Sequence, residues 1–91
     1  MGSYSIEILP TARRELLSLP RPIQKRIGQK IDSLKNNARP AGVKALKSKH
    51  GDFFRLRVGD YRILYEIRDK LLLIIVVKIG HRREVYRKIQ L

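Results

Sequence analysis

The side chains best suited to chemistry gather in the stretch GHRREVY, residues 80–86, directly after the most apolar run of the chain. Arg82 and Arg83 carry guanidinium groups, which stay charged and offer a planar fork of donors that matches two phosphate oxygens. Histidine exchanges a proton near neutral pH more readily than other side chains, so His81 could act as an acid or a base. Tyr86 could stack on a base, hydrogen-bond a phosphate oxygen or pack its ring. The stretch is typical either of a soluble surface or of a site that holds a phosphate and moves a proton.

Three further arginines lie on neighbouring strands that the sequence predicts. Arg55 and Arg57 leave the same face of FFRLRV, and Arg62 follows the tight turn at Gly59 and Asp60. In an antiparallel meander the far end of the next strand returns to this edge. We therefore expect residues 80–86 to arrive beside these arginines, so that the guanidinium groups, the imidazole and the phenol share one side of the sheet. The alternative is that the strand arginines only face solvent, as charged residues usually do.

The first half of the chain predicts one strand and two helices, which differ in the spacing of their apolar residues. Residues 4–9 alternate and predict a short strand, and two amphipathic helices follow at 11–19, with Thr11 as a possible N-cap, and at 20–37. The second helix has an apolar stripe at Ile23, Ile27, Ile31 and Leu34, and its other face is basic, with Lys25, Arg26, Lys30 and Lys35.

The second half of the chain returns to a period of two. Residues 38–52 are predicted as a loop because proline and glycine interrupt them, and strands are predicted at 53–58, 61–67 and 71–79. The stretch EVYRKIQL is expected to be a short helix or a tail. The order β-α-α-β-β-β predicts an α+β fold, with a small antiparallel sheet and two N-terminal helices packed on it.

Size and composition limit the functions of the chain. Its 91 residues suffice for one domain, 1–91, and no run is long and apolar enough for a membrane span. With neither a cysteine nor a signal peptide, the expected location is the cytoplasm. Asp60 and Asp69 fall in turns and Glu66 stands alone, so we expect neither a catalytic metal nor another cofactor. The net charge of +13 predicts polyanionic partners, either nucleic acid or an acidic protein.

The segments RLRVGD and YRILYEIRDKLLLIIVVKIGHRREVY, with the helical pair ahead of them, resemble the RelE toxins of the RelE/ParE superfamily of toxin–antitoxin systems. The resemblance covers nearly the whole chain, and VGDYRILYEI and IGHRREVY are its most specific parts. It implies a small antiparallel sheet packed by two N-terminal helices. It also implies an endoribonuclease that enters the ribosomal A site and cuts mRNA without a metal, by attack of the ribose 2′-hydroxyl on the neighbouring phosphate.

The resemblance also implies roles for single residues. Arg62 matches the arginine that stabilises the phosphate in the transition state, Arg82 the arginine beside the leaving 5′-oxygen, and Tyr86 the tyrosine that orients the substrate. Arg55 and Arg57 fall where the family usually has lysines, one of them proposed as the general base. An arginine can hardly serve as a base. We therefore hypothesise that His81 takes the proton, or that charge stabilisation carries most of the rate.

Partners follow from the charge and from the resemblance. Besides ribosome and mRNA, the resemblance implies a cognate acidic antitoxin in a heteromeric complex, which agrees with the charge of +13. Candidate RNA contacts are Lys44, Lys47, Lys49 and Arg83, although each alone is typical of a solvated charge. Two other functions stay open. The chain could inhibit DNA gyrase, as the ParE branch does, or it could be a basic module that binds RNA without cutting it.

Overall fold

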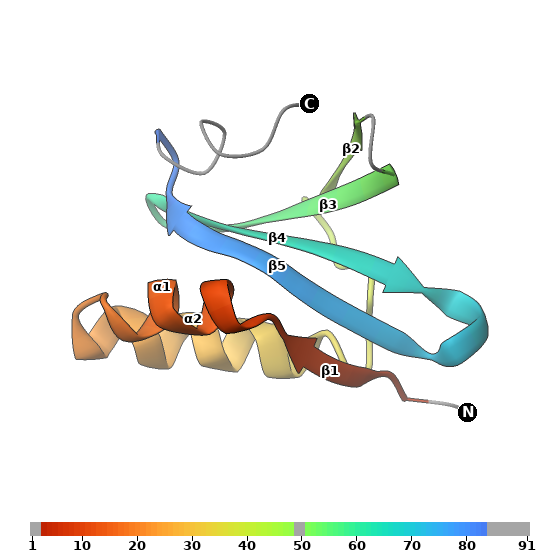
Figure 1. Ribbon diagram of the computed structural model, residues 1–91, viewed down its shortest axis with the longest axis horizontal. Coiled ribbons are helices and arrows are strands. Elements are labelled where there is room, and N and C mark those ends of the chain that lie inside the picture. The colour runs from red at the N-terminus through yellow and green to blue at the C-terminus, as the bar shows by residue number, and fades with distance from the viewer. Residues whose placement is uncertain (1–2, 49–50, 84–91) are drawn as a thin grey trace.

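The computed structural model describes residues 3–48 and 51–83 and arranges them as two helices on one face of a five-stranded sheet (Figure 1). The elements in chain order are β1 (Ser5–Ile8), α1 (Pro10–Leu17), α2 (Arg21–Ser33), β2 (Lys44–Ser48), β3 (Gly51–Val58), β4 (Tyr61–Arg68), the 3₁₀ turn η1 (Asp69–Leu71) and β5 (Leu73–His81). In the sheet the strands are ordered β1-β5-β4-β3-β2. The predicted α+β class is confirmed.

The predicted antiparallel meander is also confirmed. The sheet differs from the prediction at its two edge strands, β1 and β2. Strands β3, β4 and β5 pair antiparallel in sequence order, whereas β1 pairs with β5 in parallel. The sheet is therefore mixed. Residues 38–52 were predicted as a loop, but residues 44–48 form β2, which pairs antiparallel with β3. This edge strand reads KALKS, and lysines on an edge strand suppress pairing with other chains while weakening the strand signal.

A proline lies in the first turn of both helices, which the sequence predicted for α2 and not for α1. In α2, Pro22 occupies the first turn, where its missing N–H leaves no intrahelical hydrogen bond unmade. In α1 the expectation that Thr11 is the N-cap is wrong. Leu9 holds that position and Pro10 is the first helical residue, because the proline ring presets the helical φ angle. Neither helix of the described ranges is long and apolar enough to cross a membrane.

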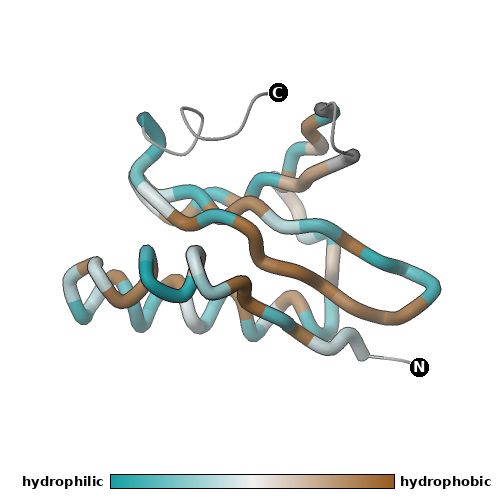
Figure 2. The backbone as a smooth tube through the Cα atoms, in the orientation of Figure 1, coloured by the Kyte–Doolittle hydropathy of each residue, from teal (hydrophilic) through white to brown (hydrophobic). Residues whose placement is uncertain are grey.

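The core lies between the helices and the near face of the sheet. Ile27, Ile31 and Leu34 bury the apolar stripe of α2 against residues of β3, β4 and β5, and Figure 2 shows the long hydrophobic run of β5. Tyr65 is fully buried at the centre of this core, and its hydroxyl donates to the Ala38 carbonyl at 2.8 Å. Burial raises the pKa of Tyr65 to about 12. The face of the sheet that meets the helices is thus occupied by packing.

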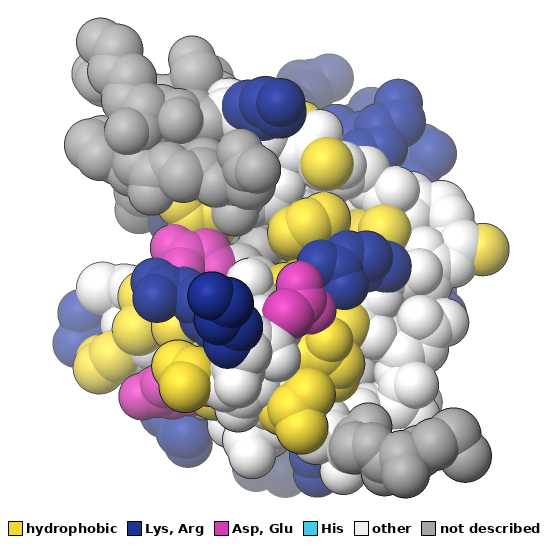
Figure 3. All heavy atoms as spheres, turned by 90° about the vertical axis from the view of Figure 1, so that its right-hand side faces the viewer, with side chains coloured by type: hydrophobic (Ala, Val, Ile, Leu, Met, Phe, Trp, Pro, Cys, Tyr) yellow, Lys and Arg dark blue, Asp and Glu magenta, His cyan; other side chains and the backbone are white. Residues whose placement is uncertain are grey.

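A polar cluster ties the β4–β5 turn to the rest of the chain. Asp69 accepts a 2.6 Å hydrogen bond from the Tyr4 hydroxyl and two hydrogen bonds from Arg39, at 2.9 and 3.3 Å. At this end of the molecule acidic and basic side chains lie next to one another (Figure 3). The hydrogen bonds from Arg39 and Tyr4 hold the pKa of Asp69 below its ordinary value.

Acid is therefore expected to weaken this cluster. A carboxylate whose pKa is lowered by folding stabilises the fold above its unfolded pKa, and this stabilisation is lost as the pH falls through the folded value. Urea unfolding of the wild type should lose stability between about pH 5 and pH 3, and part of that loss should be missing in Asp69→Asn. Asp32→Asn, which removes an exposed i,i+3 partner of Lys35, is the control. Parallel pH profiles of wild type and Asp69→Asn would argue against the role of Asp69.

Candidate functional site

The register of the sheet gathers four cations on the face opposite the helices. Arg57 lies directly across from Arg62 in the β3–β4 pair, and Lys44 lies directly across from Arg55 in the β2–β3 pair. Directly paired residues point to the same face, and so do residues two apart on one strand. Leu56 and Val58, which alternate with these arginines, belong to the core. We call Lys44, Arg55, Arg57 and Arg62 the arginine face.

Arg62 is the most firmly held member of the arginine face. Only 7% of its surface is exposed, and its Nη1 donates to the carbonyl oxygens of Gly59 and Tyr61, both at 3.0 Å. The Gly59 carbonyl belongs to the β3–β4 turn, in which Gly59 adopts a φ of +59° that other residues rarely accept, and the Tyr61 carbonyl belongs to the first residue of β4. The turn therefore fixes the Arg62 guanidinium in place before any ligand binds.

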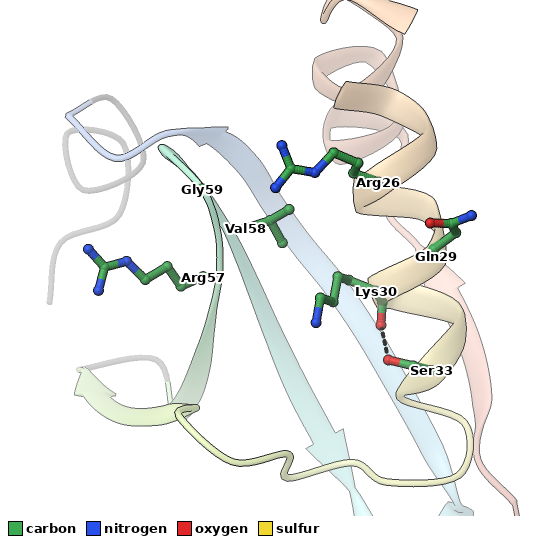
Figure 4. Close-up of a pocket in the computed structure, with 7 residues that line it drawn as sticks. All are labelled: Arg26, Gln29, Lys30, Ser33, Arg57, Val58 and Gly59. Atoms are coloured by element: carbon green, nitrogen blue, oxygen red, sulfur yellow. Dashed lines mark hydrogen bonds between the residues drawn. The ribbon is translucent and has the colours of Figure 1, made fainter. Parts of the chain in front are cut away.

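Arg57 is exposed and points away from α2 (Figure 4). Within the described ranges it forms no ion pair, and Glu66, the acidic residue of β4, is paired with Arg68 at 2.9 Å. Two cations directly opposite each other in a sheet repel, and an anion bound between or above Arg57 and Arg62 would relieve that repulsion. This arrangement is suited to binding a phosphate with more than one guanidinium.

The end of β5 returns to the arginine face, as expected from the meander. Gly80 lies directly across from Arg62, and the backbone N–H of Arg82 donates to the Asp60 carbonyl at 2.9 Å. The side chains of Arg82 and Arg83 are exposed. The predicted convergence of the 80–86 stretch with Arg57 and Arg62 is therefore confirmed for the backbone as far as residue 83.

His81 does not share a face with the arginines, and this part of the expectation is wrong. His81 pairs with Tyr61, which packs against the core, and the two rings meet edge to face with their centroids 5.9 Å apart. The imidazole lines a pocket of about 440 Å³ together with Tyr61 and with Glu15 of α1, among other residues. Its Nδ1 accepts a hydrogen bond from the Arg83 N–H at 3.3 Å. The strand itself separates His81 from the arginine face.

The two described lysines among the predicted RNA contacts lie on opposite faces of β2. Lys44 belongs to the arginine face. Lys47 follows Leu46, which shares the face of Lys44, so its side chain leaves the opposite face of the strand. Lys49 and Tyr86 lie outside the described residues. Among the residues that are described, no group of three acidic or histidine side chains is placed to hold a metal.

Sequence reasoning overlooked a buried ion pair close to the site. Glu15 of α1 pairs with Lys78 of β5, and the second carboxylate oxygen of Glu15 accepts the Ile79 N–H at 3.1 Å. The pair fastens α1 to the strand that carries residues 80–83. The one signal in the sequence is Lys78, which interrupts an apolar run. Its position alone does not show which residue it pairs with.

Known proteins share this fold and this sequence pattern. The family model for the ParE toxin of type II toxin–antitoxin systems matches residues 6–86. Toxin RelG of Mycobacterium tuberculosis is 30% identical over 86 residues, which cover 93% of this chain and 98% of the relative.

Two solved complexes contain a similar chain. In the RelE–RelB complex from Pyrococcus horikoshii the TM-score is 0.79 at 28% identity, over 90% of this chain and 98% of that chain. In the toxin–antitoxin complex RelBE2 from Mycobacterium tuberculosis the TM-score is 0.77 at 28% identity, over 88% of this chain and 99% of that chain. The five-stranded sheet, its two helices and these matches together establish that the chain belongs to the RelE/ParE superfamily and is a RelE-type toxin of a type II toxin–antitoxin system.

Proposed function

We propose that the chain is a ribosome-dependent endoribonuclease that cuts mRNA in the A site and so inhibits translation. The observation that carries the proposal is the direct opposition of Arg57 and Arg62 on the face opposite the helices, because directly paired side chains are close enough for both guanidinium groups to hold one phosphate. Membership of the RelE-type toxins and the net charge of +13 support it.

The proposed reaction is an attack of the ribose 2′-oxygen on the adjacent phosphorus. The 2′-oxygen–phosphorus bond forms and the bond from phosphorus to the 5′-oxygen breaks, which leaves a cyclic phosphate and a 5′-hydroxyl end. Negative charge grows on the phosphoryl oxygens in the transition state, where Arg57 and Arg62 can donate charge-assisted hydrogen bonds. Arg82 is assigned to the leaving 5′-oxygen, and Tyr86 to stacking on the substrate, on the strength of the resemblance.

The proton is handled without His81 in this proposal. The imidazole lies on the helix side of β5, so it cannot reach a phosphate held on the arginine face without a rearrangement of the strand. The four side chains of the arginine face are cations and none is a ready base at neutral pH. We therefore assign most of the rate to charge stabilisation, while the 2′-proton passes to water and the leaving 5′-oxygen takes a proton from water.

An acidic antitoxin is the proposed protein partner. RelB-type antitoxins accompany the RelE chains in the solved complexes from Pyrococcus horikoshii and Methanococcus jannaschii. An acidic segment laid over the arginine face would relieve the repulsion between Arg57 and Arg62 and would exclude RNA from it. Neutralisation and inhibition would then be the same event.

Inhibition of DNA gyrase is the alternative that a specific observation favours, because the matching family model is described as a ParE toxin.

Mapping mRNA 5′ ends after induction in bacterial cells separates the two functions. We expect cuts inside codons, in frame, with 5′-hydroxyl ends, since attack by the 2′-oxygen leaves that group on the downstream fragment. Intact mRNA with damaged DNA would overturn the nuclease proposal in favour of gyrase. Ends that carry a 5′-phosphate would point to a different nuclease.

A further inference from the structure

A second basic site lies next to the arginine face, between α2 and the end of β3. A pocket of about 370 Å³ is lined by Arg26, Gln29, Lys30, Ser33, Arg57, Val58 and Gly59. Arg26 and Lys30 reach from α2 toward β3, and Arg57 leaves β3 on the other side (Figure 4). Arg57 therefore connects the pocket to the arginine face, so that one extended ligand could occupy both.

The polar lining of the pocket is rich in hydrogen-bond donors. Three of the seven residues are cations and none is acidic. Within residues 3–48 and 51–83, Arg26 and Lys30 form no ion pair, whereas Lys35, further along the same helix, is paired with Asp32. The Ser33 hydroxyl donates to the Lys30 carbonyl at 2.6 Å. The pocket thus concentrates positive charge that the described protein does not neutralise.

The β3–β4 turn brings the pocket close to the site proposed for cleavage. A Cβ added to Gly59 would lie 3.8 Å from an Arg26 guanidinium nitrogen, so Arg26 extends across the pocket to this turn. The same turn provides the carbonyl that holds Arg62. A phosphate bound by Arg26 and a phosphate bound by Arg62 could therefore be near neighbours in one RNA strand.

The lining favours a nucleic acid backbone over a protein segment. Protein segments bind through buried apolar and aromatic anchors, but Val58 is the only aliphatic side chain among the seven residues. Phosphate backbones are held by arginine, lysine, serine and glutamine side chains, which are the other types present. Resting on the function proposed above, we infer that this pocket binds a backbone phosphate of RNA beside the scissile one and sets the path of the strand across the arginine face.

The test is the salt dependence of RNA binding by the full chain, measured by fluorescence anisotropy. The probe is a fluorescein-labelled 2′-O-methyl oligouridylate, in which the methyl group blocks attack by the 2′-oxygen, so binding is separated from cleavage. The pair Arg26→Gln and Lys30→Gln should weaken binding about tenfold and lower the slope of log affinity against log salt by about 0.7, the value for one phosphate contact to a single strand.

The matched control changes the same helix by the same charge. Arg21→Gln with Lys25→Gln alters two exposed residues of α2 outside the seven that line the pocket. The RNA affinity of this control variant should fall less than about threefold, because the loss of two charges only weakens the overall positive potential of the protein. Gln29→Glu, an isosteric change that puts a carboxylate into the pocket, should weaken binding as the first pair does, and thermal melts verify folding. Equal losses in the two double variants would overturn the site.

The choice of ligand and the link to cleavage are tested separately. If the pocket variant loses affinity for polyglutamate as strongly as for RNA, the assignment to RNA is overturned in favour of an acidic protein. If binding depends on the pocket while mRNA in cells stays uncut, the nuclease proposal fails and the pocket stands. If mRNA is cut normally while binding ignores the pocket, only the inference about the pocket fails.

Discussion

Replacing Arg57 with glutamine is expected to slow mRNA cleavage on programmed ribosomes by about 10²-fold or more, because one charged donor to the transition state is lost. Arg57 suits this test better than Arg62, which holds the β3–β4 turn and is buried. The Arg57 side chain is exposed and opposes Arg62, so its removal relieves repulsion. The melting temperature should stay the same or rise, while the rate of a single turnover falls.

Three comparisons make the Arg57 result specific. Arg57→Lys keeps the charge but loses the planar fork, so its rate should lie between wild type and Arg57→Gln. Arg14→Gln, an equal loss of charge on α1, should leave the rate nearly unchanged. His81→Gln should retain cleavage, because its ring lies on the helix side of β5. A variant Arg57→Gln that binds ribosomes more weakly but cuts normally once bound would identify a binding module rather than a catalytic group.

The placement of Arg57 beside Arg62 could be predicted because alternation along a strand is a local property. In FFRLRV and YRILYEI one face is entirely apolar or aromatic and enters the core, whereas the opposite face mixes Phe53 and Leu64 with the arginines, so alternation predicts which side chains face the helices. The two-residue turn between them, at Gly59 and Asp60, then fixes the register. Strand periodicity and turn length together place the arginines on one face without reference to any distant part of the chain.

The position of His81 could not be predicted in this way. Leu64 pairs with Lys78 but Tyr65 pairs with Val76, so Val77 is an extra residue in β5. A bulge of one residue moves every later side chain to the opposite face. The run before Lys78 is apolar on both faces, so its sequence carries no alternation that would reveal the bulge. The imidazole consequently lies beside Tyr61 and not beside Arg62.

The ion pair between Glu15 and Lys78 escaped prediction for a different reason, since its partners are 63 residues apart in the chain. Each residue alone fits a solvent-facing role, and only the packing of α1 on β5 brings them together. In the fold the exposed fractions of the two side chains are 20% for Glu15 and 10% for Lys78. Long-range pairs of this kind depend on helix placement, which local patterns do not specify.

Glu15→Gln is expected to destabilise the fold by about 3 kcal/mol, because the largely buried Lys78 ammonium loses its ion pair with the Glu15 carboxylate. The carboxylate also accepts the Ile79 N–H, next to the strand end that carries Arg82. Urea unfolding at neutral pH measures the loss, and the melting temperature should fall by roughly 10 °C or more. Cleavage by the fraction that remains folded should change much less than in Arg57→Gln, since Glu15 lies on the helix side.

The control is the same substitution at an exposed ion pair. Glu66→Gln removes the partner of Arg68, whose side chain is 55% exposed, and should cost less than about 1 kcal/mol. Replacing both buried partners, with Glu15→Leu and Lys78→Met, should recover much of the stability lost in Glu15→Gln, because no charge is then left uncompensated. If the double variant is as unstable as Glu15→Gln, the loss comes from packing or from the Ile79 hydrogen bond, and the stranded charge is not its cause.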